Sequence, residues 1–284
     1  MIYFCADDYG LSESVSARIK QCVVDGCLNK VSIFPNFGQF DLHKLSETKP
    51  VRTSLHLNLV EGLCMADADG MDLIVNKDGN FKHTFGGLLG LNFLCGKKLE
   101  AQVYREIKAQ VLFWKNKQSD GAPFCIDSHQ HTHMIPAVFR AMLRVLRDEG
   151  ITPDYVRIPA EPILPYLKTP SLYFTYNAVG VIKQWLLKFL WMMNRHHAKN
   201  HNIPSAHFFG VLLSGEMDET RVRKLLPKYI RLAEKDGRDI EVLFHPGHAD
   251  QLDAKNIVFG RFYRSENRKL EFDSVMKLSE RSVL

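Results

Sequence analysis

The sequence has few cysteines, and none of them stands in a pair that typically binds zinc. There are six, without a CxxC spacing, at positions 5, 22, 27, 64, 95 and 125. A chain of 284 residues can also bury a sizeable core without cross-links. We therefore expect reduced thiols and a cytoplasmic protein, with neither a disulfide framework nor a cysteine zinc site.

Three further signals are missing. The stretch MIYFCADDYG reaches two acidic residues without a basic region followed by an apolar one, so we expect no signal peptide. The most apolar stretch, Trp185 to Met193, contains a lysine and is much shorter than the roughly 20 residues of a membrane span. The net charge of +5 is mild and forms no basic arm, so we expect no nucleic-acid partner.

The chain does contain an alternation of strand-like and helix-like segments. The β-rich runs are Ile2–Ala6, Val31–Pro35, Arg52–Leu59, Phe124–Ser128, Tyr155–Ile158, His207–Leu213 and Ile240–Phe244. Amphipathic stretches such as Ala137–Glu149 and Glu219–Asp236 lie between them, and Ser12 has the place of an N-cap. This alternation predicts an α/β fold with a parallel sheet. About seven parallel strands, without a GxGxxG turn, favour one domain over 1–284, a distorted (β/α) barrel similar to a TIM barrel.

Two stretches, 61–97 and 160–206, are too long to be ordinary loops of such a barrel, and we expect functional excursions there. The second contains an apolar segment, 179–197, in which lysine and arginine are interspersed. We favour a helix of the core or of a subunit interface, and a homo-oligomer is compatible with it. The alternative is a helix that contacts a membrane surface, with Trp185 and Trp191 at the level of the lipid headgroups.

The stretch CIDSHQHTHM, residues 125–134, is the densest group of polar residues. His129, His131 and His133 stand at every second position. If a strand continues through them, alternation places all three on one face, which is a good arrangement for a metal ion. The structural alternative is a surface cluster of histidines.

Polar residues also follow the other expected strands. The C-terminal ends of parallel strands in a barrel open onto one face, so residues distant in sequence converge there. The residues concerned are Asp7 and Asp8 after the first strand, His56 and Asn58 in the third, Arg157 in the fifth, and His245 and His248 after the seventh. Carboxylates and imidazoles suit a divalent ion, zinc most naturally, with Mn, Co or Ni as alternatives. Metal ligands, a base and an acid for hydrolysis can come from Asp7, Asp8, His56, His129 and His245.

Each of these residues also has a structural interpretation. An Asp-Asp pair at a strand end can cap a helix, and a histidine among leucines, such as His56, can be a buried core residue. It is their combined placement at strand ends that favours a site.

Five segments carry a resemblance to a known family. ADDYGLS, SLHLNLVEG, IDSHQHTHMIP, VRIP and HPG occur in that order, and with them the chain resembles the YdjC-like carbohydrate deacetylases, which include the chitooligosaccharide deacetylases. The third segment departs from the form DSHHHVH, because Gln130 and Thr132 stand in it. The resemblance implies a distorted (β/α) barrel, a divalent metal ion, and removal of the N-acetyl group from an acetylated amino sugar or oligosaccharide.

The resemblance also implies roles by position. Asp8, His56 and His129 correspond to the metal ligands, Asp7 to the general base and His245 to the general acid. Arg157 would orient Asp7 or hold the substrate. His131 would face the substrate or lie behind the ligands, or at most be a further ligand, and His133 would lie past the strand end. The family's metal is described as magnesium or zinc, and two histidines with one aspartate favour zinc, because magnesium prefers oxygen ligands.

Two other functions remain open from the residues. A metal-dependent phosphoesterase would also use Asp and His at barrel strand ends, with Asp127 as a carboxylate that bridges two ions. A non-catalytic sugar-binding barrel would keep the fold without needing Asp7. We favour the deacetylase because Asp7, Asp8 and His245 are all present.

Overall fold

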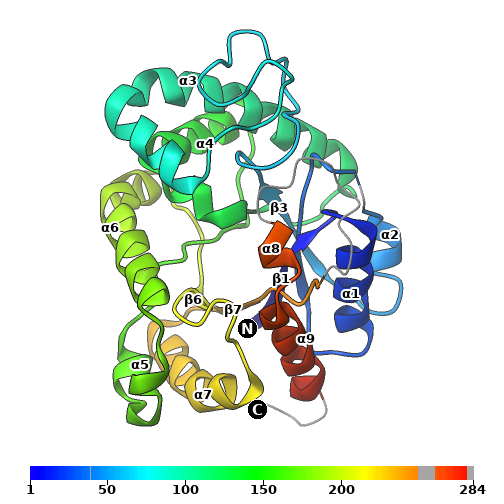
Figure 1. The fold of residues 1–284 in the computed structure, drawn as a ribbon, viewed down its shortest axis with the longest axis vertical. Helices are drawn as coiled ribbons and strands as arrows, with labels where there is room; N and C mark the ends of the chain where they lie inside the picture. The colour runs from blue at the N-terminus through cyan, green and yellow to red at the C-terminus, as the bar shows by residue number, and fades with distance from the viewer. Residues whose placement is uncertain (39, 249–259, 280–284) are drawn as a thin grey trace.

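Seven parallel strands form the centre of the fold, and helices surround them (Figure 1). The structure is a computed structural model that describes residues 1–38, 40–248 and 260–279. The strands are β1 (Ile2–Tyr9), β2 (Lys30–Ile33), β3 (Arg52–Leu57), β4 (Cys125–Ser128), β5 (Tyr155–Val156), β6 (His207–Phe209) and β7 (Ile240–Phe244). All seven predicted strands are confirmed, although several end earlier or later than expected.

The strands follow the order β5-β4-β3-β2-β1-β7-β6, so the first strand lies within the sheet. The parallel register places Cys5 beside Leu243 and His56 beside Asp127. The edge strands β5 and β6 do not pair with each other within the described part of the chain. The predicted distorted barrel is therefore confirmed in the form of a curled half-barrel.

Helices connect the strands along the outside of the sheet. They are α1 (Glu13–Val24), α2 (Leu42–Leu45), α3 (Phe85–Lys117), α4 (Pro136–Asp148), α5 (Leu164–Leu167), α6 (Ala178–Asn200), α7 (Glu219–Asp236), α8 (Gly260–Tyr263) and α9 (Glu266–Ser279). Ser12 caps α1 as predicted, because its Oγ accepts a hydrogen bond from the N–H of Val15 at 3.3 Å. The predicted bounds of α7 are confirmed, and Gly237 ends this helix in the left-handed conformation.

The two predicted excursions contain helices of their own. The first, 61–97, runs into α3, whose backbone leaves helical geometry at Cys95. The second, 160–206, contains α5, a short 3-10 helix η2 (Pro170–Thr175) and α6, and it connects the two edge strands of the sheet. Helix α6 is thus part of the segment that spans the open side of the half-barrel (Figure 1). Within the described ranges, no helix is long and apolar enough to cross a membrane.

Helix α6 approaches the segment after β6 very closely at Gly180. A Cβ atom at this glycine would lie 2.3 Å from the carbonyl oxygen of Leu212. Gly180→Ala should therefore lower the free energy of unfolding by about 1–3 kcal/mol, because an added methyl group forces the two segments apart.

Gly90→Ala in α3 is the matched control, since a Cβ atom there meets open space. Alanine stabilises a helix relative to glycine, so the free energy of unfolding of this variant should rise by up to ~1 kcal/mol. Urea unfolding of both variants measures the difference. Equal effects of the two substitutions would contradict the close approach of α6.

Candidate metal and active site

A break in strand β1 brings two neighbouring carboxylates together. In a regular strand Asp7 and Asp8 would point to opposite faces of the sheet. The pairing of β1 with β2 shifts register between Ala6 and Tyr9, and Asp8 has a φ of 75°. A positive φ is unfavourable for a non-glycine residue and is common at functional sites. As a result, His56 Nε2 lies 4.0 Å from Asp7 Oδ2 and 3.6 Å from Asp8 Oδ1.

His56 on β3 is fixed by the neighbouring strand β4. Its Nδ1 lies 2.6 Å from Asp127 Oδ1, and the other Asp127 oxygen accepts a hydrogen bond from Ser32 at 2.6 Å. Burial alone would lower the pKa of His56, but the charge of Asp7 and the contacts with the other carboxylates raise it to about 10. The surrounding carboxylates therefore strongly favour positive charge at this point.

The histidine-rich stretch does not continue strand β4, which ends where the predicted strand ends. Strand β4 ends at Ser128, and a 3-10 helix, η1 (His129–Met134), follows with φ of 53° at Gln130 and 58° at His131. The condition for three histidines on one strand face is therefore not met, because this tight turn replaces the strand, and His133 lies past the strand end as expected.

The residues of η1 consequently have different surroundings. His131 and Gln130 both line the cavity of the site, whereas a continuing strand would have turned Gln130 away from it. His133 is buried, with Nδ1 2.5 Å from Ser128 Oγ and Nε2 2.8 Å from the carbonyl oxygen of Arg157. His133 therefore fixes the turn from behind and does not face the site.

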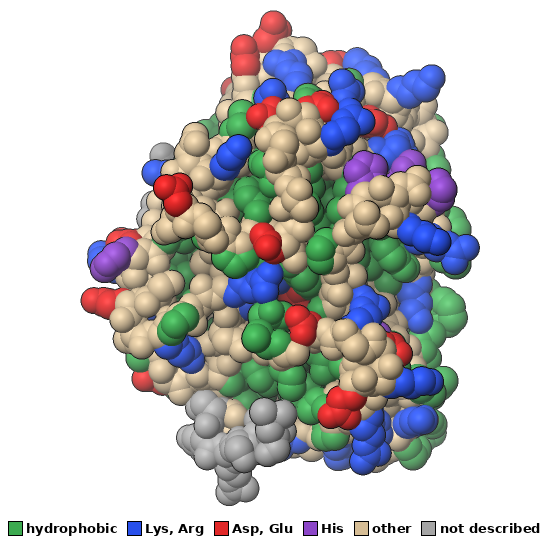
Figure 2. All heavy atoms as spheres, turned by 180° about the vertical axis from the view of Figure 1, so that it is seen from behind, with side chains coloured by type: hydrophobic (Ala, Val, Ile, Leu, Met, Phe, Trp, Pro, Cys, Tyr) green, Lys and Arg blue, Asp and Glu red, His purple; other side chains and the backbone are tan. Residues whose placement is uncertain are grey.

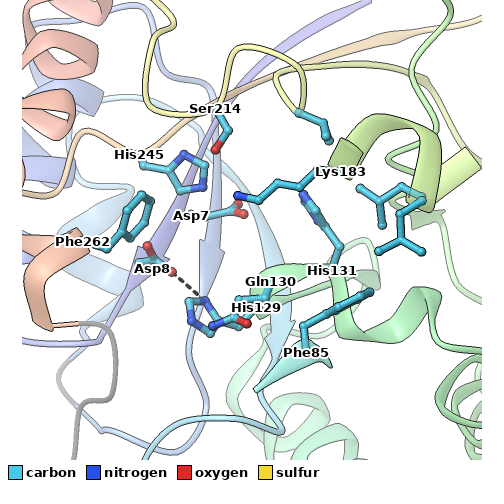
Figure 3. A pocket seen from close by; sticks show the side chains of 13 residues that line it. Asp7, Asp8, Phe85, His129, Gln130, His131, Lys183, Ser214, His245 and Phe262 are labelled. Atoms are coloured by element: carbon cyan, nitrogen blue, oxygen red, sulfur yellow. Dashed lines mark ion pairs between the residues drawn. The ribbon is translucent and has the colours of Figure 1, made fainter. Parts of the chain in front are cut away.

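Three buried donor atoms meet beside Asp7 and form a group that could hold a metal ion. Asp8 Oδ1 lies 3.2 Å from His129 Nδ1, an ion pair that Figure 3 marks with a dashed line. Asp8 Oδ1 also lies 3.6 Å from His56 Nε2, and the ligand atoms of the three residues lie within 4.8 Å of one another. Neither Asp8 Oδ1 nor His56 Nε2 has a hydrogen-bond partner among the described residues, although both are buried. Buried polar atoms normally have partners. The group therefore fits a divalent cation, and the structure brings together the three predicted ligands.

Asp7 is fixed from inside the half-barrel by Arg157, which follows β5. Arg157 donates from its two Nη atoms to the two Asp7 oxygens at 2.7 and 2.8 Å. It also donates to Glu241 at 2.6 and 2.8 Å, and Lys30 donates to the same carboxylate at 3.0 Å. Arg157 is completely buried behind Asp7. Of its two expected roles, orienting Asp7 fits this geometry, and contact with a substrate does not.

Helix α9 supports the site from a distant part of the sequence. Arg268 donates to Asp8 Oδ2, and also to the carbonyl oxygen of Gly247 at 2.9 Å. Burial raises the pKa of Asp8, but the charge of Arg268 and the contacts with two histidines bring it well below its usual range. One turn further along, Glu271 Oε2 lies 3.4 Å from His245 Nδ1 and accepts the backbone N–H of His245 at 2.5 Å. The same helix therefore positions a candidate ligand and a candidate acid.

A cavity of about 330 Å³ opens in front of the two aspartates (Figure 3). Five predicted site residues line it: Asp7, Asp8, His129, His131 and His245. The rest of the wall is Phe85, Gln130, Lys183, Leu186, Leu187, Val211, Ser214 and Phe262. A mainly apolar cavity with a few converging polar groups is typical of a site for a small molecule.

Several residues of the site were not predicted. Arg268 and Glu271 lie on α9, and Tyr263, whose hydroxyl is 3.3 Å from His129 Nε2, lies on α8. Lys183 lies in the apolar segment of α6. The three-residue spacing of Arg268 and Glu271 places them on one helix face, but it does not indicate what that face contacts.

His133 should make folding depend on pH. Burial lowers its pKa to about 4. The unfolded chain takes up this proton near pH ~6.5 and the folded chain only near pH 4, so stability is lost as the pH falls through this window, by up to ~3 kcal/mol. His133→Asn should lose this part of the pH dependence, measured by urea unfolding at neutral and acidic pH. His43→Asn, at an exposed histidine, is the control. If the free energy of unfolding of His133→Asn depends on pH as that of the wild type does, His133 is not held neutral in the folded chain.

Known proteins share sequence with this chain. A carbohydrate deacetylase of Danio rerio is 32% identical over 174 residues, which is 61% of this chain and 54% of that protein. A carbohydrate deacetylase of Mus musculus is 27% identical over 158 residues, 55% of this chain and 49% of that protein. The one of Clostridium beijerinckii is 21% identical over 191 residues, 65% of this chain and 73% of that protein. The matched region spans about half the length of the vertebrate relatives.

A solved structure matches the fold of the chain, and a family model matches its whole length. The solved structure of an Enterococcus faecalis V583 protein named for cellobiose-phosphate cleavage aligns with a TM-score of 0.66 at 15% identity. The alignment covers 98% of this chain and 94% of that one, and at this identity it concerns the fold alone. The family model described as YdjC-like protein matches residues 1–284. The chain therefore belongs to the YdjC-like family.

Proposed function

We propose that the protein is a metal-dependent carbohydrate deacetylase that removes the acetyl group from an N-acetylated amino sugar. The observation that carries this proposal is the convergence of Asp8, His56 and His129 beside a cavity that also contains Asp7 and His245. Relatives named carbohydrate deacetylase support the class of reaction. Amide hydrolysis needs a base, an acid and stabilisation of a developing oxyanion, and this site offers groups for each.

Asp8, His56 and His129 would hold the metal ion. Two imidazoles and one carboxylate favour zinc or a similar ion, and magnesium, which prefers oxygen ligands, is the alternative. Such an ion, when bound, activates water and polarises a carbonyl group. Asp127 fixes the ring of His56 through Nδ1, as carboxylates behind metal-binding histidines commonly do.

Asp7 and His245 would move the protons of the reaction. The carboxylate of Asp7 lines the cavity in an orientation that Arg157 fixes, so it can take the proton of the attacking water. His245 has Nδ1 beside Glu271, which leaves its other ring nitrogen for the departing nitrogen of the sugar. The carboxylate of Glu271 is placed to orient the ring of His245. Acetate and the free amino sugar are the products.

The surroundings of Asp127 argue against the phosphoesterase alternative. That function needs a carboxylate free to bridge two ions. One Asp127 oxygen contacts His56, and the other accepts from Ser32 and lies 3.4 Å from Arg157 Nη2. Both oxygens are therefore engaged, and we expect a single ion per chain.

Asp7→Asn and Asp8→Asn should both lose activity, but only Asp8→Asn should also lose metal. Asp7→Asn leaves the three ligands in place, so metal content should stay near the wild-type value while kcat for acetate release falls by ~100-fold or more. Asp8→Asn removes the anionic ligand and should lower metal content as well as kcat. Elemental analysis of the desalted proteins, together with acetate release from N-acetylated oligosaccharides, separates the two outcomes. An active Asp7→Asn protein would contradict the proposed base.

Glu271→Gln should lower kcat for acetate release with KM little changed, because the carboxylate that lies 3.4 Å from His245 Nδ1 and orients its ring is lost. A purely structural role of Glu271, which also accepts the N–H of Gly215 at 2.7 Å, would instead lower the free energy of unfolding, measured with urea, without a selective fall of kcat. Glu266→Gln, at an exposed position of the same helix, is the control.

A further inference from the structure

Helix α6 is apolar on two opposite faces. One face packs against the body of the protein through Gly180, Gln184, Leu187, Leu190, Asn194 and Ala198. Each residue turns a helix by about 100°, so Ile182 and Gln184 point in nearly opposite directions. The outer face carries Ile182, Trp185 and Phe189, which are 66%, 60% and 49% exposed, and also the exposed Val179, Met192 and Met193. Scattered exposed apolar residues are normal, but a continuous stripe along a helix indicates a contact surface.

The elements that lead into α6 extend this surface. Leu164 and Leu167 on α5, and Tyr173 and Phe174 on η2, are exposed as well. A second cavity of about 280 Å³ lies among α5, η2 and α6, with Leu167, Tyr173, Val181 and Trp185 in its wall. The exposed apolar side chains of α5, η2 and α6, together with this cavity, are called the α6 surface below.

The charge around the α6 surface has one sign. Residues 160–206 contain five basic residues, Lys168, Lys183, Lys188, Arg195 and Lys199, and one acidic residue, Glu161. Glu161 is buried, with its carboxylate bonded to the backbone N–H groups of the segment after β6. The segment thus carries +4 of the chain's net +5. Figure 2 shows hydrophobic and basic side chains intermixed along the right-hand edge, which is the α6 side of Figure 1.

The lysines also have a defined place on the helix. At about 100° per residue, Lys188, Arg195 and Lys199 fall on one border of the exposed apolar stripe, whereas Lys183 lies on the side of the catalytic cavity. A basic border along an apolar stripe with tryptophan is typical of helices that lie in the interface of a bilayer. A second copy of the chain would instead bring two basic surfaces together, and like charges oppose that contact.

We propose that the α6 surface binds an anionic lipid bilayer, and that the enzyme takes an N-acetylated amino sugar whose other end is anchored in lipid. The second part rests on the proposed deacetylase function. It is supported by the shared helix: Lys183, Leu186 and Leu187 line the catalytic cavity, while neighbouring residues of α6 form the outer stripe. Docking through α6 places the catalytic cavity next to the lipid headgroups. Lys183 makes no hydrogen bond or ion pair among the described residues, so its ammonium group is available for an anionic linkage such as a phosphodiester.

Co-sedimentation with vesicles tests the docking surface without any turnover. The full chain should pellet with vesicles of an equal mixture of phosphatidylcholine and phosphatidylglycerol, and much less with phosphatidylcholine alone. Trp185→Glu/Phe189→Glu should weaken binding to the vesicles by at least about tenfold, because two negative charges replace the aromatic side chains that would insert into the bilayer. Val24→Glu, at an exposed apolar position of α1, is the matched control and should bind as the wild type does. Equal binding by the double variant and the control would overturn the proposal.

Two further measurements keep the test decisive. The tryptophan emission of the wild-type chain should shift to the blue when anionic vesicles are added, which requires no variant. Light scattering should show that the double substitution leaves the oligomeric state unchanged; a dimer that the substitution dissociates, with no vesicle binding, would assign the surface to a second copy of the chain.

Acetate release separates this proposal from the proposed function. The wild-type chain should release acetate faster from an N-acetylglucosaminyl lipid in anionic vesicles than from N-acetylated oligosaccharides in solution, and the double variant should lose that advantage. Release from soluble sugars without vesicle binding would overturn the docking surface and leave the deacetylase. Vesicle binding without release from either substrate would overturn the deacetylase and leave the docking surface.

Discussion

The contact between His56 and Asp127 is the interaction on which the site depends. It joins neighbouring strands at 2.6 Å and uses one nitrogen of the imidazole, so the other nitrogen faces Asp8. Asp127 is in turn held by Ser32 and Arg157, which also holds Asp7. The candidate ligand His56 and the candidate base Asp7 are therefore oriented through one buried network, whereas Asp8 is held by Arg268. Orientation of this kind is what a metal site requires beyond its ligands.

Charge is the second constraint on this region. The carboxylates of Asp7, Asp8, Asp127 and Glu241 are all buried, and a buried charge is costly unless it is paired. Arg157 and Lys30 pair with this network inside the half-barrel, and Arg268 on α9 pairs with Asp8 from the other side. The atoms left without partners, Asp8 Oδ1 and His56 Nε2, face each other where a cation fits. Lys30 and Arg157 come from the sheet and the segment next to it, whereas Arg268 comes from a helix that follows the last strand.

The sequence was sufficient to predict the strands and the convergence of the candidate site residues. Alternation of strand and helix patterns predicts the parallel sheet, and the common direction of parallel strands predicts that Asp7, Asp8, His56, His129 and His245 meet at one end of it. The choice of the three candidate ligands among them comes from the resemblance to the family. The conformation of the histidine stretch could not be predicted from alternation, because Gln130 and His131 have positive φ angles and His133 contacts the distant Arg157, and strand periodicity encodes neither. Arg268 and Glu271 could not be assigned either, since the packing of α9 against the site is set by the whole fold.

The central claim is that a metal ion held by Asp8, His56 and His129 supports hydrolysis of an N-acetyl group. The most direct test is acetate release from a panel of N-acetylated amino sugars, free and lipid-anchored, by the same preparation before chelation, after chelation, and after addition of zinc, cobalt or magnesium. The account predicts that chelation abolishes release and that zinc or cobalt restores it better than magnesium. Release that is unaffected by chelation, or no release from any substrate with metal bound at this site, would contradict it.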